Sequence, residues 1–178
     1  MPDLSRIRED VRHEQFFFDD ATIKRLVALA DRADDPLLLC LPSIATALAT
    51  RGTPARLLDR DRRFMGLSRA QRFDLHQPDF LEGSHDLLLC DPPFANVELA
   101  TLKRTVDLLV AGAMRPVEHP ALGIAYISSR GPALKKAFAH YDLRVVGPPL
   151  GYRSVAGHTQ DRIRLYLSRG ARALCGLP

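Results

Sequence analysis

The chain has 178 residues, with 46% hydrophobic and 26% charged side chains and a formal net charge of +4. This length and balance suit one globular domain over residues 1–178, and they exclude a helical membrane protein because no apolar run approaches about 20 residues. The charged N-terminus lacks the apolar core of a signal peptide and the three cysteines lack metal-ligand spacing, so we expect a cytoplasmic protein without a membrane partner or a metal site.

Helical and strand-like patterns alternate along the chain. Asp20 precedes apolar residues at helical spacing, and the short apolar runs that follow are typical of buried parallel strands. The predicted elements are, in chain order, a helix from Asp20, strand Leu37–Leu41, helix Ile44–Thr50, strand Ala55–Leu58, strand Gln71–Leu75, strand Asp86–Cys90, a helix capped by Asn96, strand Leu122–Ile127, helix Pro132–His140, strand Leu143–Val146 and strand Ile163–Leu167.

This alternation predicts an α/β fold with a doubly wound, Rossmann-like, seven-stranded sheet. The sheet is expected to be mostly parallel, with an antiparallel edge formed by the last two strands because no helical pattern separates them. Residues 1–19 form a predicted N-terminal extension that carries the aromatic segment Phe16–Phe18.

Polar residues follow the first four predicted strands. Pro42 and Ser43 follow the first, Asp59 the second, Asp74 lies at the third, and Asp91 follows the fourth. In doubly wound sheets ligands bind outside the carboxyl ends of the strands. Any one of these residues is explained by the preference of turns for Asp, Ser and Pro. Polar residues after four successive strands favour a binding site.

The tetrapeptide Asp91-Pro92-Pro93-Phe94 directly follows an apolar strand. Two prolines fix φ near −65° and remove two N–H donors, so the turn is stiff and its carbonyls can face a cleft. The Asp91 carboxylate and a backbone carbonyl can both accept hydrogen bonds from one planar NH2 group. Phe94 offers a face for base stacking, which contributes about 1–3 kcal/mol per base in nucleic-acid sites. An ordinary strand-to-loop exit is the alternative interpretation.

With these residues the chain resembles class I S-adenosylmethionine-dependent methyltransferases. More specifically, it resembles the family known both as N6-adenine methyltransferase-like and as elongation-factor-1A lysine methyltransferase. The resemblance covers about residues 15–167 and is carried by the segments Gln15–Phe18, Leu41–Ser43, Asp59–Phe64, Asp74–Pro78 and Asp91–Phe94.

The resemblance implies S-adenosylmethionine as the cofactor and a role for each matching segment. The backbone around Leu41, Pro42 and Ser43 would face its methionine part, Asp59 would accept from its ribose hydroxyls, and Asp74 from its adenine amino group. The catalytic tetrapeptide would hold the acceptor amine through Asp91 and the Pro92 carbonyl, with Pro93 stiffening the turn and Phe94 flanking the amine. The aromatic residues expected to wall the pocket are Phe16, Phe17 and Phe18.

One feature differs from most methyltransferases, which place glycines after the first strand so that the backbone approaches the cofactor closely. The segment Leu41–Ala45 contains no glycine, so weak cofactor binding is one expectation. The lysine-methylating relatives have a Pro-Ser at this point too.

The segment Gly147–Asp161 is long and rich in glycine and proline, as binding loops and lids often are. Its expected substrate contacts are Tyr152, Arg153 and His158, and a surface loop without a function is the alternative.

Three functions remain open from the sequence. The first is methyl transfer to an exocyclic amine, namely adenine N6 in RNA or DNA, which the mild positive charge permits. The second is methylation of a protein lysine, and the third is a non-catalytic binding module with a degenerate cofactor site. Because the chain has no added RNA-binding module, specificity would come from its own loops or from an accessory protein.

Overall fold

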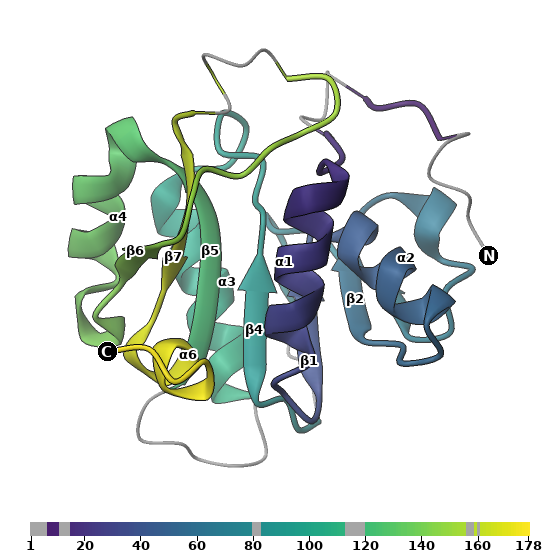
Figure 1. Ribbon diagram of the computed structural model, residues 1–178, viewed down its shortest axis with the longest axis horizontal. Helices are drawn as coiled ribbons and strands as arrows, with labels where there is room; N and C mark the ends of the chain where they lie inside the picture. The colour runs from purple at the N-terminus through teal and green to yellow at the C-terminus, as the bar shows by residue number, and fades with distance from the viewer. Residues whose placement is uncertain (1–6, 11–14, 80–82, 113–119, 156–158, 160) are drawn as a thin grey trace.

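The computed structural model describes residues 7–10, 15–79, 83–112, 120–155, 159 and 161–178. They form a sheet with the strand order β3-β2-β1-β4-β5-β7-β6 (Figure 1). The strands are β1 (Pro36–Leu39), β2 (Arg56–Asp59), β3 (Ala70–Arg72), β4 (Leu87–Cys90), β5 (Ala121–Ile127), β6 (Arg144–Val146) and β7 (Ile163–Leu167). The α-helices are α1 (Asp20–Ala30), α2 (Pro42–Thr50), α3 (Leu99–Ala111), α4 (Gly131–Ala137) and α6 (Arg169–Leu174).

The sheet confirms the predicted mixed topology. Strands β1 to β5 pair in parallel, with Leu38 opposite Leu57 on one side and Leu89 on the other. Strand β7 is antiparallel to both β5 and β6 and lies between them, so β6 occupies the edge. The predicted antiparallel edge is therefore present, but the last strand in the sequence, β7, lies inside the sheet and β6 forms its edge.

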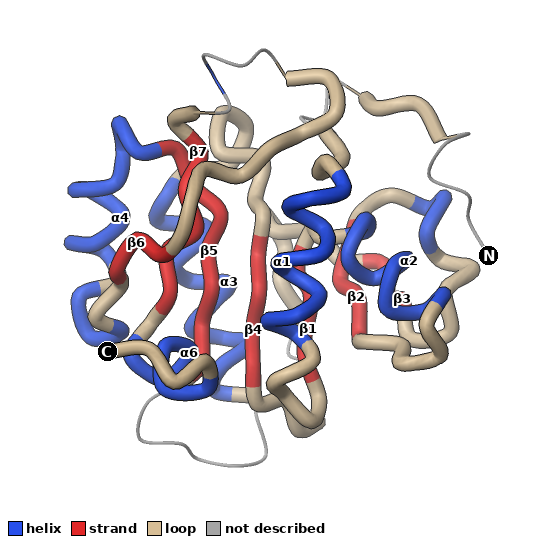
Figure 2. Tube along the Cα trace, in the orientation of Figure 1, coloured by secondary structure: helices blue, strands red, loops and turns tan. Residues whose placement is uncertain are grey.

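Helices cover both faces of the sheet (Figure 2). Helices α1, α2 and α6 pack over one core cluster, and α3 and α4 pack over the other. Neighbouring strand residues alternate between these clusters, since Leu38 belongs to the first and Leu37 and Leu39 to the second. Burial on both faces explains why the parallel strands are continuous apolar runs in the sequence.

Several predicted boundaries were wrong for local reasons. Strand β1 ends at Leu39 because Cys40 adopts a positive φ of 57°, and α2 begins directly at Pro42. Asn96 does not cap α3, because the Asn96 N–H donates to the Pro93 carbonyl in an additional turn and the helix begins after Glu98.

Three further differences concern short elements. Strand β3 covers Ala70–Arg72 rather than Gln71–Leu75, because Asp74 closes a turn by accepting from the backbone N–H of His76 at 2.9 Å. Helix α4 ends at Ala137, and a 3₁₀ turn, Ala139–Tyr141, follows it. Helix α6 was not predicted, although Ser168 caps it by accepting from the Ala171 N–H.

No helix in the described part of the chain combines the length and the apolar character that a membrane crossing requires.

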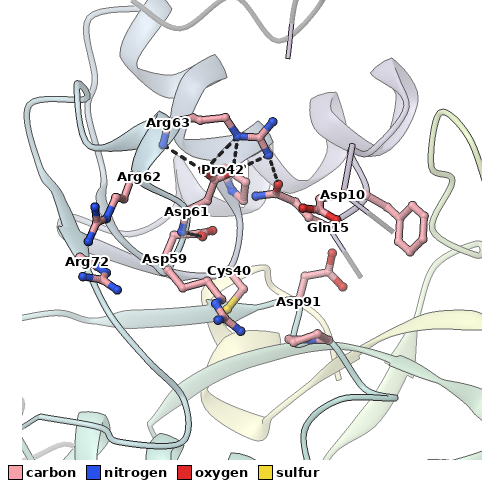
Figure 3. A pocket seen from close by; sticks show the side chains of 13 residues that line it. Asp10, Gln15, Cys40, Pro42, Asp59, Asp61, Arg62, Arg63, Arg72 and Asp91 are labelled. Carbon is pink, nitrogen blue, oxygen red and sulfur yellow. Dashed lines mark hydrogen bonds and ion pairs between the residues drawn. The ribbon is translucent and has the colours of Figure 1, made fainter. Parts of the chain in front are cut away.

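The carboxyl ends of β1, β2 and β4 meet at one edge of the sheet. The chain runs from β1 outward through β2 to β3 and then returns to β4 on the other side of β1. Strand β1 lies between β2 and β4, so the strand order reverses there. Figure 3 shows Cys40, Asp59 and Asp91 gathered at these ends. Such a reversal is the usual ligand site of an open α/β sheet.

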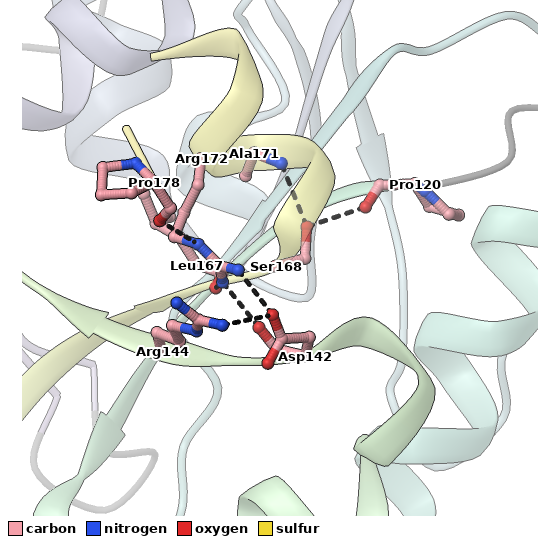
Figure 4. A network of polar contacts seen from close by, with 8 residues as sticks. All are labelled: Pro120, Asp142, Arg144, Leu167, Ser168, Ala171, Arg172 and Pro178. Carbon is pink, nitrogen blue, oxygen red and sulfur yellow. Dashed lines mark hydrogen bonds and ion pairs between the residues drawn. The ribbon is translucent and has the colours of Figure 1, made fainter. Parts of the chain in front are cut away.

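A polar network fastens α6 to the connection before β6 (Figure 4). Arg172 is only 4% exposed. Its guanidinium donates hydrogen bonds to the carboxylate and to the backbone carbonyl of Asp142, each at 2.6 Å. It also donates to the carbonyls of Leu167 and Pro178 at 3.0 and 2.8 Å. Asp142 has a φ of 49°, a backbone conformation that most residues avoid. Arg172 binds two oxygen atoms of this residue, its carbonyl and its carboxylate.

We expect Arg172→Met to lower the melting temperature by about 5–10 °C, because several carbonyls lose a charged donor while the apolar stem is kept. Thermal unfolding followed by circular dichroism measures the effect. Arg144→Ala is the matched control, since Arg144 contacts the same Asp142 carboxylate at 3.3 Å from an exposed position. The control should shift the melting temperature by less than about 2 °C, and equal shifts for both variants would contradict this account.

Candidate active site

The loop after β4 places Asp91 at the centre of the site. The four strand residues before it are buried, and the Asp91 N–H donates to the Leu39 carbonyl at 3.2 Å, which fixes the loop against β1. The hydroxyl of Tyr152 donates to Asp91 Oδ1 at 2.8 Å. The Pro93 carbonyl accepts from two following backbone N–H groups, so the chain turns back sharply after the two prolines.

An apolar cavity of about 170 Å³ lies on one side of Asp91. We call it the Asp91 cavity. The Phe94 ring at its wall packs edge-on against Tyr126, with centroids 5.8 Å apart, and the Phe94 carbonyl accepts from Arg130 at 2.7 Å. These contacts fix the ring and the backbone of Phe94. The cavity is lined by Phe16, Asp91, Pro92, Pro93, Phe94, Tyr152, Val155, Thr159 and Ile163.

A larger cavity of about 380 Å³ lies on the other side of Asp91 and is named here the Asp59 cavity. Its volume falls in the range of small-molecule sites, about 300–1,000 Å³. Asp91, Pro93 and Phe16 line both this cavity and the Asp91 cavity. A ligand in each would therefore meet at the Asp91 carboxylate.

Asp59 ends β2 and is only 5% exposed. Its Oδ1 accepts from the Asp61 N–H at 2.8 Å. Burial raises the pKa of the Asp59 carboxyl to about 6, despite the hydrogen bonds that oppose the change. A buried carboxylate with this pKa is typical of a functional site, because its burial is unfavourable unless a ligand uses the charge.

The N-terminal extension contributes to the rim of the Asp59 cavity (Figure 3). Arg63 donates to Asp61 Oδ2 at 2.9 Å, to the Arg8 carbonyl at 2.8 Å and to the Gln15 side chain. Gln15 and Asp10 line the cavity with residues that follow β1 and β2. The extension is thereby joined to the sheet at the site itself.

A third cavity, of about 190 Å³, is called the Asp74 cavity and continues from the Asp59 cavity. The two share Cys40, Arg60 and Pro93. Asp74 lies on its wall, beside the apolar side chains of Phe73 and Val97. Together the two cavities form one extended site with a carboxylate in each part.

The residues after β1 are placed differently from one another. Pro42 lines the Asp59 cavity, whereas the side chains of Leu41 and Ser43 are each 2% exposed and pack inward. Any contact from Leu41 or Ser43 to a ligand would therefore come from the backbone, as the sequence analysis expected.

The aromatic segment is corrected by the structure. Phe16 lines the Asp59 and Asp91 cavities, but Phe17 and Phe18 are each 1% exposed and belong to the core. Phe17 packs edge-on against Phe64 at 6.0 Å, and Phe18 packs on Tyr152 at 4.6 Å. Three consecutive side chains cannot face one cavity, and burial of two of them was more favourable.

The three loop residues predicted to contact substrate also separate. Tyr152 lines the Asp91 cavity. Arg153 does not line the described cavities and lies 3.7 Å from the exposed carboxylate of Asp20, so its contact with substrate stays a prediction. His158 lies outside the described residues.

Sequence reasoning missed Cys40, which lies within the predicted buried strand Leu37–Leu41 and instead lines two of the cavities. Its φ of 57° is one that glycine adopts readily and other residues rarely. The signal was the missing glycine itself, because the turn after β1 still needs this conformation. Cys40 meets the requirement at a cost of about 1–3 kcal/mol in backbone strain.

We expect Cys40→Val to lower the melting temperature by at least about 5 °C, because a β-branched side chain is strongly disfavoured at this φ. Cys40→Gly should stay within about 2 °C of the parent, since relief of strain offsets the lost packing. Differential scanning calorimetry of both variants checks the pair. Equal melting temperatures for valine and glycine would show that the left-handed turn is not needed.

Comparison with protein families identifies the chain. The model of the family described as "Probable N6-adenine methyltransferase" matches residues 9–128, which is more than half of the 178 residues. The chain belongs to this family. It is therefore a methyltransferase whose methyl donor is S-adenosylmethionine. No curated protein matches the chain.

Solved structures share the methyltransferase fold. Protein 1320 of Thermoplasma acidophilum is 15% identical over 87% of this chain and 88% of that one, with a TM-score of 0.55. A TehB-like methyltransferase from Corynebacterium glutamicum is 15% identical over 83% and 85% of the two chains, with a TM-score of 0.56. The T. thermophilus 16S rRNA N2 G1207 methyltransferase RsmC is 16% identical over 84% of this chain and 38% of that one, with a TM-score of 0.53.

Proposed function

We propose that this methyltransferase transfers the methyl group to an exocyclic amine, namely adenine N6 in RNA or DNA. The observation that carries the proposal is the position of Asp91, which lines both the Asp59 cavity and the apolar Asp91 cavity. A carboxylate between a cofactor-sized cavity and an apolar cavity with Phe94 suits a planar base whose amino group points toward the cofactor. The name of the matching family supports adenine as that base.

The Asp59 and Asp74 cavities fit S-adenosylmethionine by their donor sets. Asp59 would accept from the ribose hydroxyls and Asp74 from the adenine amino group, with the backbone around Pro42 near the methionine part. The continuity of these cavities through Cys40 suits a ligand made of linked parts. When bound, the cofactor supplies an electrophilic methyl group on its sulfonium.

Asp91 and the Pro92 carbonyl would hold the acceptor NH2 group, and Phe94 would stack on the ring that carries it. This grip directs the nitrogen lone pair toward the methyl group, and positioning of this kind contributes much of the rate in transfer reactions. With the cofactor bound, formation of the N–C bond would accompany cleavage of the S–C bond, whose electron pair would stay on sulfur. The proton lost from nitrogen passes to water or to Asp91.

The carboxylate of Asp91 favours a neutral amine over a lysine as the acceptor. A lysine is protonated at neutral pH and must lose its proton before methylation, and a carboxylate beside it opposes that loss. An adenine amino group is neutral and needs no such deprotonation.

The nucleic acid partner follows from this acceptor. An adenine within a duplex must flip out at a cost of a few kcal/mol, whereas a looped or single-stranded RNA presents it directly. We also propose that residues 1–178 act as one cytoplasmic catalytic domain, with an accessory protein as one source of target specificity. The extension of residues 1–19 would contribute through Phe16, Gln15 and Asp10.

The test is transfer of labelled methyl from S-adenosylmethionine into a demodified cell extract, followed by separate nuclease and protease digestion. The proposal expects label that nuclease releases and protease does not. Label released by protease alone would replace the adenine assignment with a lysine acceptor. Heat-treated enzyme is the control, and it should transfer no labelled methyl group.

A further inference from the structure

We propose that Tyr152 is a positioning residue for methyl transfer, whose hydroxyl holds the Asp91 carboxylate in the orientation that receives the acceptor amine. The inference rests on the proposed function, because it assigns Tyr152 a part in the same site. It differs from the sequence prediction, in which Tyr152 contacted the substrate.

The contact is a hydrogen bond of ordinary length whose tyrosine side is buried. Tyr152 is 5% exposed, and its hydroxyl donates to Asp91 Oδ1 at 2.8 Å. A hydrogen bond to a charged group is roughly twice as strong as one between neutral groups. This bond therefore restricts rotation of the Asp91 carboxylate.

The Tyr152 ring is fixed by the N-terminal aromatic segment. Phe18 packs on it at 4.6 Å, and Phe18 and Tyr152 form an isolated antiparallel bridge. The residues on either side are joined in the same way, since Asp19 N–H donates to the Gly151 carbonyl at 3.0 Å and Arg153 N–H to the Phe17 carbonyl at 2.8 Å. Burial of Phe18 thus has a consequence at the active site.

Glycine is required beside Tyr152 because the loop lies directly against the start of α1. A Cβ at position 151 would come within 2.0 Å of Asp19 Oδ2, the carboxylate that caps α1. The Gly151 N–H also donates to the Thr22 hydroxyl at 2.9 Å. The loop, α1 and the aromatic segment therefore hold Tyr152 as one packed unit.

The hydroxyl remains a donor at every working pH. Burial, followed by the charge of Asp91, raises the pKa of Tyr152 well above its ordinary value. The proton therefore stays on Tyr152, and its role is to orient the carboxylate rather than to take part in proton transfer. Methyl transfer itself remains between the cofactor and the amine held by Asp91.

Tyr152→Phe separates orientation from packing, because phenylalanine keeps the ring that packs on Phe18 and removes the hydroxyl alone. We expect the single-turnover rate at saturating cofactor and acceptor to fall about 10- to 100-fold. The acceptor KM and the cofactor Kd should change by less than about twofold. Tyr166→Phe, which removes a hydroxyl from a buried tyrosine on β7, should leave the rate unchanged.

The rate is measured with whichever acceptor the parent enzyme labels, nucleic acid or protein, so the test does not depend on the adenine assignment. An unchanged rate in Tyr152→Phe would overturn the positioning role even if the parent methylates adenine. A rate loss matched by an equal loss of cofactor affinity, or by a melting temperature more than about 5 °C lower, would also overturn it, because a packing role predicts that result.

Discussion

Replacing Asp91 by alanine is expected to lower methyl transfer by about 100-fold or more while cofactor affinity changes by less than about twofold. The carboxylate lines both the Asp59 and the Asp91 cavities, so it is placed to hold the amine and not to bind the distant parts of the cofactor. Losses of this size are usual when a preorganised group at the reacting atoms is removed. Single-turnover transfer and isothermal titration with S-adenosylmethionine measure the two quantities.

A control variant and a stability measurement make this result interpretable. Asp31→Ala removes another carboxylate, which pairs with Arg51 on the surface at 2.8 Å, and should leave transfer unchanged. Asp91→Ala also leaves the buried Tyr152 hydroxyl without its acceptor, so a melting temperature several degrees lower is expected and does not explain a 100-fold loss. Transfer that persists near the parental rate would place the acceptor amine elsewhere.

Asp59→Asn is expected to weaken S-adenosylmethionine binding about tenfold or more, yet to leave the unliganded protein equally or more stable at pH 7.5. Asparagine keeps an oxygen for the Asp61 N–H but removes the charge that would accept from the ribose hydroxyls. The carboxyl pKa of about 6 is above its usual value of 3.8, so the folded state is disfavoured once the group ionises. Thermal shift with and without cofactor reports both effects.

The ionisation of Asp59 sets how the stability of the fold and the affinity for the cofactor depend on pH. Stability attributable to Asp59 is greatest below its unfolded pKa and decreases as the pH rises toward 6, because burial opposes the charge. Cofactor binding should run in the opposite direction and weaken about tenfold at pH 5, where most of the carboxyl is protonated. Asp59→Asn should abolish this dependence, and a binding constant equally pH-dependent in both proteins would remove Asp59 from the cofactor site.

The fold was predictable because its main signals are local. Leu37 to Leu39 and Leu87 to Cys90 are continuous apolar runs, and a sheet covered on both faces needs such runs. The position of β7 between β5 and β6 was not predictable in this way. Antiparallel pairing with two neighbours depends on contacts between segments far apart in the chain, which periodicity does not report.

The site was only partly predictable for a related reason. Strand ends placed Asp59, Asp74 and Asp91 at one edge, and the structure brings them onto adjoining cavities. The sequence did not reveal that Tyr152 reaches Asp91, because a packed loop and the aromatic segment bring them together. It also failed to separate Phe16 from its two buried neighbours, since side-chain direction in an irregular segment has no fixed period.

The conformation of Cys40 shows how a departure from a family pattern can be compensated. The turn after β1 adopts the positive φ without a glycine, and its side chain borders two cavities. Absence of glycine in the sequence therefore does not mean absence of the turn. Strain concentrated at this point fits the general tendency of functional sites to hold unfavourable backbone conformations.

Nucleoside analysis of the methylated product tests the central claim most directly. Unmodified RNA and DNA would be incubated with S-adenosylmethionine and either the parent enzyme or Asp91→Ala, digested to nucleosides and examined by mass spectrometry. The account predicts N6-methyladenine nucleoside from the parent reaction and none above background from Asp91→Ala. Methylation confined to another base, or to protein lysine in a parallel protein digest, would contradict it.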